Sequence, residues 1–268
     1  MLQRITKAAT LLNSARSFLS NSELWCDYLD WYSKHGGWIQ HYRDLYSEQD
    51  CFILCNGPSL NRVDLAKLND YHCIGLNKIY MLFERVKLNL TFHVAVNKLV
   101  IEQSLQEFTK LECPSFISYQ VARHDLKQAN NINYIYAEHR VAPRFSRVYD
   151  EPIWEGYTVT NVALQLAFFM GFQNVFIIGM DHSFATSGKP NEQQLLQGND
   201  SNHFDPNYFA GCQWHLPDLE GSELSYRMAQ FAYQRSGRCI YDATVGGKCT
   251  IFSKINMNEA FDVCKKRG

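Results

Sequence analysis

The stretch Cys51-Phe-Ile-Leu-Cys-Asn-Gly-Pro-Ser-Leu60 joins a short apolar run to a turn that contains glycine and proline. An apolar run of this length is typical of one buried strand, and a proline suits the first turn of a following helix. The alternation recurs along the chain. Apolar runs at 51–55, 72–76, 92–96, 115–119, 174–180 and 238–241 are separated by amphipathic segments at 59–69, 98–110, 158–171 and 222–236. Strands that alternate with helices predict an α/β fold, with a Rossmann-like, mostly parallel sheet flanked by helices.

The composition is that of a globular chain of 268 residues, with 46% hydrophobic and 20% charged residues. A chain of this length buries a sizeable core. Its net charge of -1 lacks the basic excess of nucleic-acid-binding proteins, so we expect no nucleic acid as a partner. The nine cysteines include no Cys-x-x-Cys pair and indicate no disulfide framework, which predicts a cytoplasmic protein.

The amino-terminal region differs in pattern from the rest. Residues 1–48 carry aromatic side chains at helical spacing, among them Trp25, Trp31 and Trp38, and predict an N-terminal helical extension. Residues 49–268 form the predicted Rossmann-like, nucleotide-binding catalytic domain. We favour packing of the aromatic side chains against this domain. The alternatives are docking of a second copy, which would give a homo-oligomer, and peripheral association with a membrane.

A long segment at 183–219 is rich in glycine, proline and asparagine and shows little periodicity. A loop of this length inside a compact domain is often a lid or a binding loop, so we expect a lid here. It carries His203, and histidine is the side chain best suited to proton transfer near neutral pH. Either Asp200 or Asp205 would orient that ring. The alternative is a surface histidine in a polar loop.

Polar side chains follow four of the predicted strands. Asn56, Asn77 and Asn97 follow three consecutive runs, and Asp181 follows the fourth, with His182 as a second candidate for proton transfer. The carboxyl ends of parallel strands meet at one edge of a sheet, and ligands bind there near the reversal of strand order. The pattern therefore predicts a single pocket. Each asparagine taken alone is also a common turn former.

Several segments offer groups for a phosphate. Gly57 lets the backbone approach a ligand, and Ser59 places a hydroxyl at a strand-to-helix corner, which is a natural anion site. A tight turn uses the same residue types. Other candidates are Thr158, Thr160, Asn161 and Lys248. The alternative is that the first three only cap a helix and that Lys248 lies in an ordinary turn.

The motifs taken together resemble two related groups. The first is the Campylobacter-type bacterial sialyltransferases, family 42 of the glycosyltransferases. The second is the DUF115 proteins, the 6-hydroxymethylpterin diphosphokinase MptE-like family, many of them from bacterial surface-polysaccharide loci. The resemblance covers roughly residues 50–252. It rests on segments 56–60, 77, 97, 158–161, 179–181 and 199–204 for the first group, and on 75–80, 203–208 and 241–248 for the second.

The sialyltransferase resemblance implies a set of roles. The asparagines and the glycine corner would bind cytidine monophosphate (CMP), with His203 as general base. Asp181 and His182 are further catalytic candidates because they follow a predicted strand. The implied partners are a CMP-activated sugar donor and a glycan acceptor, with no metal and no other cofactor.

One departure concerns the leaving phosphate. The sialyltransferases hold it with lid tyrosines shortly after Gly-Ile-Asp, whereas this chain has His182, Ser183 and Phe184 there. Stabilisation of the leaving group then falls to Lys248, His182 or Tyr208, or the donor differs.

We therefore predict a metal-independent, inverting glycosyltransferase that uses a CMP-activated, nonulosonate-like sugar in surface polysaccharide or glycoconjugate biosynthesis. One alternative is ATP-dependent diphosphate transfer to a pterin alcohol, for which Asp181 and Asp205 are the obvious carboxylates to hold magnesium. A second alternative is a non-catalytic nucleotide-sugar-binding protein.

Overall fold

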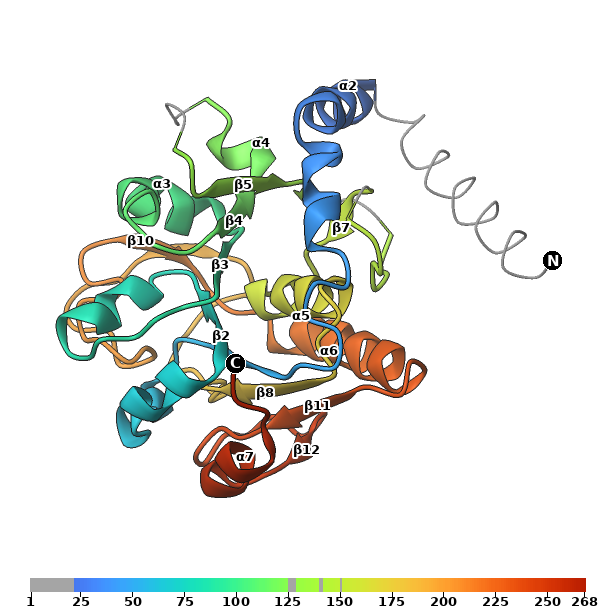
Figure 1. Cartoon of the computed structure of the whole chain (residues 1–268). Helices are drawn as coiled ribbons and strands as arrows, with labels where there is room; N and C mark the ends of the chain where they lie inside the picture. The colour runs from blue at the N-terminus through green and yellow to red at the C-terminus, as the bar shows by residue number, and fades with distance from the viewer. Residues whose placement is uncertain (1–21, 125–128, 140–141, 150) are drawn as a thin grey trace.

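A computed structural model describes residues 22–124, 129–139, 142–149 and 151–268 (Figure 1). Eight strands form one sheet, and all neighbouring pairs in it are parallel. Their order is β12 (Ser253–Lys254), β11 (Cys239–Asp242), β8 (Asn174–Ile178), β1 (Cys51–Leu54), β2 (His72–Leu76), β3 (Phe92–Ala95), β4 (Ser115–Ser118) and β5 (Ile132–Ile135). The predicted Rossmann-like α/β fold is confirmed.

The strand order reverses at β1. The chain runs from β1 through β2 to β5 on one side, then returns to place β8 against the other side of β1. Leu54 at the end of β1 is paired with Gly75 on β2 and with Ile178 on β8. In an open parallel sheet, the crevice at such a reversal is where ligands bind. Asn56 and Asp181, which follow β1 and β8, lie at this crevice.

Helices cover both faces of the sheet (Figure 1). On one face lie α5 (Val159–Phe169) and α6 (Leu219–Gln234). On the other face lie η3 (Pro58–Arg62), η4 (Leu65–Asp70), η5 (Ile79–Glu84), α3 (Lys98–Phe108) and α7 (Met257–Val263). In β1, Ile53 packs into the first layer and Phe52 and Leu54 into the second, because successive strand residues point to opposite faces. This double burial explains why the strands are continuous apolar runs.

Two short strand pairs lie outside the main sheet. β6 (Ala137–Glu138) and β7 (Ile153–Trp154) are parallel, and β9 (Gln193–Leu195) and β10 (Gln213–His215) form an antiparallel pair. The second pair lies within 183–219. The segment that carries His203 therefore connects two paired strands. One further helix, α4 (Tyr119–Ala122), follows β4.

The amino-terminal extension is helical where it is described. It comprises α2 (Ser22–Trp31), the π-helix η1 (Tyr32–Gly36) and the 3-10 helix η2 (Trp38–Tyr42). Trp31 is buried and its Nε1 donates to the Tyr134 carbonyl (2.9 Å), whereas Trp25 and Trp38 are exposed. The first 21 residues lie outside the described part of the chain. Within the described part, every helix is too short or too polar to cross a bilayer.

Two helix predictions require correction. The helix expected over 59–69 is two 3-10 helices, η3 and η4. The helix expected to begin at 222 begins instead at Leu219, because the Asp218 side chain accepts from the Gly221 N–H (2.8 Å) and caps it.

Candidate active site

The turn after β1 packs directly against the turn after β8. The Gly57 N–H donates to the Gly179 carbonyl (2.8 Å), and the Ser59 hydroxyl donates to Asp181 Oδ2 (2.6 Å). The Ser59 N–H donates to the same carboxylate, 3.2 Å from Oδ1. A Cβ atom at Gly57 would lie 2.0 Å from Asp181 Oδ2, so only glycine fits. Asp181 is therefore engaged with Ser59, whose own side chain is buried.

A first cavity, of about 160 Å³, opens at the β1 and β8 ends. Asn56 is 8% exposed there, and its Oδ1 accepts no hydrogen bond from the described residues. A buried amide oxygen without a partner is costly, so a ligand donor suits this position. The predicted site residues that line this cavity are Asn56, Gly57, Thr158, Thr160, Asp181, His182 and His203.

The start of α5 also borders the first cavity. Thr158 caps the helix by accepting from the Thr160 N–H (3.3 Å), and both residues line the wall. Thr160 Oγ1 also lies 3.5 Å from Cys55 Sγ. The N-terminus of this eleven-residue helix carries partial positive charge, which favours an anionic group such as a phosphate.

A second, larger cavity of about 770 Å³ adjoins the first. Asn77 and Asn97 line it, and Thr158 and His203 border both cavities. Asn97 caps α3 by accepting from the Val100 N–H (3.2 Å). The three asparagines therefore face two adjoining cavities, Asn56 the first and the other two the second, with His203 at the wall between them. This arrangement differs from the single pocket predicted from the strand ends.

Asn77 is held by a buried histidine that the sequence analysis did not single out. His93 Nε2 lies 2.7 Å from the Asn77 carbonyl oxygen, and its Nδ1 lies 2.6 Å from Ser115 Oγ. Burial lowers the pKa of His93 to about 4, so the ring is neutral near pH 7. This contact fixes the backbone of Asn77, which has a left-handed φ of 49°. The Asn77 Oδ1 is buried and has no partner among the described residues.

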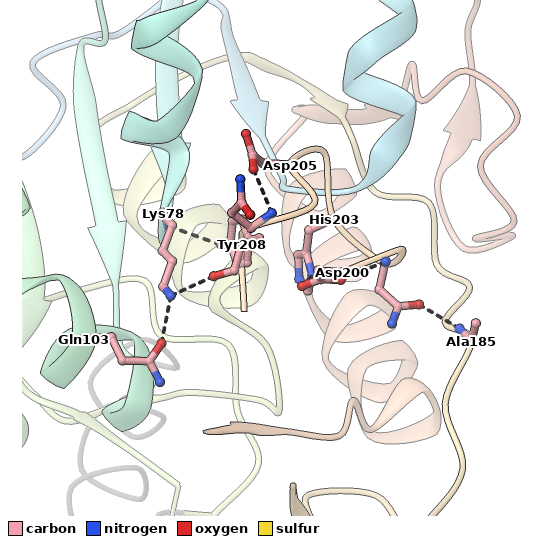
Figure 2. Close-up of polar contacts among 9 residues, drawn as sticks. Lys78, Gln103, Ala185, Asp200, His203, Asp205 and Tyr208 are labelled. Carbon is pink, nitrogen blue, oxygen red and sulfur yellow. Dashed lines mark hydrogen bonds and ion pairs between the residues drawn. The ribbon is translucent and has the colours of Figure 1, made fainter. Parts of the chain in front are cut away.

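His203 forms a pair with a buried carboxylate (Figure 2). Its Nδ1 lies 2.8 Å from Asp200 Oδ2, and the Asp200 side chain is 1% exposed. Asp205 instead accepts from the Asn207 N–H (2.8 Å), so Asp200 is the residue that orients the ring. Nε2 of His203 has no hydrogen-bond partner in the described ranges. This nitrogen is available to accept a proton from a bound hydroxyl.

Tyr208 and Lys78 fix the segment around His203. The Tyr208 hydroxyl accepts from the Lys78 N–H (3.2 Å), and Lys78 Nζ donates to the Tyr208 carbonyl (2.8 Å) and to Gln103 Oε1 (2.7 Å), as Figure 2 shows. The Phe204 N–H donates to the Asn56 carbonyl (2.9 Å). The segment is thus tied to the ends of β1 and β2. The Tyr208 hydroxyl is buried and already engaged, so it does not face a leaving phosphate.

The remaining predicted residues lie in different surroundings. His182 borders the first cavity, has a left-handed φ of 52°, and places Nε2 3.2 Å from Glu223 Oε1. Asn161 is buried and donates to the Trp154 carbonyl (3.1 Å). The Lys248 side chain is exposed and its backbone N–H donates to the Asp181 carbonyl (2.9 Å). Three predicted residues line neither cavity: Ser59, Asn161 and Lys248.

Solved structures similar to this chain include two transferases, and the first of them has a TM-score above 0.5. The MAf glycosyltransferase from Magnetospirillum magneticum AMB-1 matches with a TM-score of 0.51 and 14% identity, over 86% of this chain and 38% of that one. This chain thus spans well under half the length of that protein. The sialyltransferase CstII from Campylobacter jejuni, in complex with a substrate analogue, cytidine-5'-monophosphate, matches with a TM-score of 0.46 and 13% identity, over 79% of this chain and 86% of that one.

Comparison with curated proteins gave no match. A family model does match, over residues 34–187, and its description is 6-hydroxymethylpterin diphosphokinase MptE-like. This range covers more than half of the chain and includes both turns that meet at the first cavity. The resemblance to this family expected from the sequence is confirmed, and the chain belongs to the MptE-like family.

Proposed function

We propose that this protein is a metal-independent, inverting glycosyltransferase that uses a CMP-activated, nonulosonate-like sugar in surface polysaccharide or glycoconjugate biosynthesis. One observation carries the proposal. His203, oriented by buried Asp200, lies at the wall shared by two cavities. A base between two cavities suits a transfer in which one cavity holds the donor and the other holds the acceptor.

The first cavity suits the nucleotide of the donor. The unpartnered Asn56 Oδ1 accepts from a base or ribose donor. The space beside the Gly57 Cα is taken by the Asp181 carboxylate, so this glycine shapes the cavity by letting the two turns meet. The α5 N-terminus with Thr158 and Thr160 favours the phosphate. These groups are neutral donors and acceptors, which need no cation between them and a nucleoside monophosphate.

His203 would act on the acceptor hydroxyl. Nε2 takes the proton as the hydroxyl oxygen bonds to the anomeric carbon, and the bond from that carbon to the phosphate oxygen breaks with its electron pair leaving on CMP. Attack on the face opposite the leaving group inverts the anomeric centre through an oxocarbenium-like state. The departing phosphate is already charged and needs hydrogen-bond donors rather than an acid. Of the three candidates for that role, His182 borders the first cavity.

The activity in the family description is the main alternative. Diphosphate transfer from ATP normally uses magnesium held by carboxylates. The two carboxylates nominated for it are each engaged elsewhere, Asp181 with Ser59 and Asp205 with the Asn207 N–H. We therefore rank this activity second.

Thermal unfolding with added nucleotides tests the donor. We expect CMP to raise the melting temperature equally with and without magnesium. Stabilisation by ATP with magnesium alone would contradict the proposal and support the diphosphokinase activity.

Replacement of the base separates an enzyme from a binding protein. We expect His203→Ala to keep the CMP-induced stabilisation and to lose sugar transfer. His124→Ala, at an exposed histidine that lines neither cavity, is the matched control. Equal transfer rates in both variants would rule out His203 as the base.

A further inference from the structure

The second cavity carries two carboxylates that the steps above do not use. Glu138 ends β6, Glu155 directly follows β7, and both line the cavity. β6 and β7 are parallel, with Glu138 opposite Trp154, so the carboxylates arrive at the same end of the pair. We propose that this cavity is the acceptor site and that Glu155, with Glu138, selects a neutral, hydroxyl-rich saccharide over an acidic one. The inference rests on the proposed function.

The Glu155 carboxyl group has no partner in the described part of the chain and has an altered pKa. Its side chain makes no hydrogen bond or ion pair with the described residues. Burial and the nearby Glu138 raise the pKa of Glu155 to about 8. The group is therefore mostly protonated near pH 7 and ionises as the pH rises. Glu155 is half-buried and lines the cavity, so a bound hydroxyl can form a hydrogen bond with its carboxyl group.

Other lining atoms point to the same ligand chemistry. Asn77 Oδ1 and Gln120 Nε2 both line this cavity, and both are buried without a partner in the described part of the chain. One accepts and the other donates, and hydroxyl groups do both. Trp154, Tyr157 and Trp214 also line the cavity and offer apolar surface to a sugar ring.

Tyr157 marks the boundary of the two cavities. It lines both, is 53% exposed, and has a left-handed φ of 66°. A bulky side chain rarely adopts this conformation, and residues held in it concentrate at functional sites. Tyr157 thus lies beside Glu155 where an acceptor ring would approach His203.

The charges around the cavity oppose an anion. The other titratable side chains that line it are Lys98, His139, Tyr157, His203 and His215. Lys98 is exposed and lies 3.7 Å from Glu102, and the exposed His139 lies 3.3 Å from Glu138. Burial lowers the pKa of His215, which keeps it neutral. Glu138 brings the negative charge to this wall near pH 7, and Glu155 adds to it as the pH rises past about 8, which repels a ligand carboxylate.

Matched pairs of small glycosides test the inference. Methyl β-D-glucoside and methyl β-D-glucuronide differ only in a hydroxymethyl or a carboxylate group, and the corresponding galactosides form a second pair. Affinities are measured by NMR titration with and without CMP. We expect the acidic member of at least one pair to bind about tenfold more weakly near pH 7, and the gap to widen severalfold near pH 9 as Glu155 ionises.

Glu155→Gln keeps the side-chain shape and removes the ionisation. In this variant we expect a gap that stays constant between these two pH values, while CMP binding is unchanged. Glu112→Gln, at an exposed glutamate that lines neither cavity, should behave like the natural protein.

The inference would be overturned by acidic glycosides that bind as tightly as neutral ones near pH 9, or by an equal widening of the affinity gap in Glu155→Gln. Binding of CMP without binding of any glycoside would also overturn it, and would leave the donor proposal standing. Glycoside selectivity without CMP binding would contradict the donor proposal alone.

Discussion

The rings of His203 and Tyr208 stack face to face, with centroids 4.1 Å apart and planes 3° from parallel. Tyr208 fixes the plane of the imidazole, and Asp200 fixes its rotation through Nδ1. Lys78 in turn holds Tyr208 from the end of β2. The orientation of the base therefore depends on two separate contacts, and each can be removed without the other.

Asp200→Asn tests the contact that sets the rotation of His203. The amide keeps the size of the side chain but loses the charge that stabilises a protonated ring. We expect the rate of sugar transfer to fall by about 10²-fold to 10⁴-fold, with the CMP-induced rise in melting temperature unchanged. Asp205→Asn is the matched control and should retain the natural rate. A parallel loss of CMP stabilisation would argue against an orienting role.

Two replacements at Tyr208 separate its hydroxyl from its ring. Tyr208→Phe keeps the stack and removes the acceptor for the Lys78 N–H, so we expect the free energy of unfolding to fall by about 1 to 3 kcal/mol with little change in transfer rate. Tyr208→Leu removes the stack as well and should lower the rate. Urea unfolding and the NMR signals of the His203 ring give the two readouts. Unchanged ring signals in Tyr208→Leu would show that the stack does not position the base.

Gly57→Ala tests the close contact between the two turns. The added methyl group would lie 2.0 Å from Asp181 Oδ2 and 2.6 Å from the Gly179 carbonyl oxygen. We expect the free energy of unfolding to fall by about 1 to 3 kcal/mol, together with a loss of CMP binding. Gly37→Ala, where a methyl group meets no atom within 4 Å, is the control. If both variants bind CMP equally well, the contact between Gly57 and Asp181 is looser than described.

Glu155 makes stability depend on pH in a defined direction. Its folded pKa, about 8, lies above the ordinary value of 4.5, so the folded state binds more protons than the unfolded state between these values. Stability therefore falls as the pH rises through this range, by at most about 1.4 kcal/mol per pH unit. The free energy of unfolding in urea is measured for the natural protein and for Glu155→Gln. We expect the free energy of the natural protein to fall relative to that of the variant as the pH rises toward 8. A constant difference between them would mean that Glu155 titrates normally.

The strand pattern was predictable because most sheet strands are buried on both faces. The runs at 51–55 and 72–76 match β1 and β2 closely. By contrast, β5 was missed because it lies at an edge and alternates Ile132, Asn133, Tyr134 and Ile135. The strands β9 and β10 are exposed and short, so no apolar run marks them.

The candidate site was predictable in outline and not in its contacts. Strand ends placed Asn56, Asn77 and Asn97 at one edge of the sheet. The choice between Asp200 and Asp205 depends on a local turn, which has no signal in residue spacing. Glu155 was missed because β6 and β7, which bring it and Glu138 to the second cavity, are too short to show a pattern.

The reversal of strand order at β1 also governs when the site can form during synthesis. The Ser59 to Asp181 contact and the Phe204 to Asn56 contact each join residues more than a hundred positions apart. When the nascent chain has left the ribosome only as far as β5, strands β1 to β5 are available but the binding crevice cannot form. Such long-range closure slows folding, so ligand affinity should arise late, after the segment up to Tyr208 has left the exit tunnel.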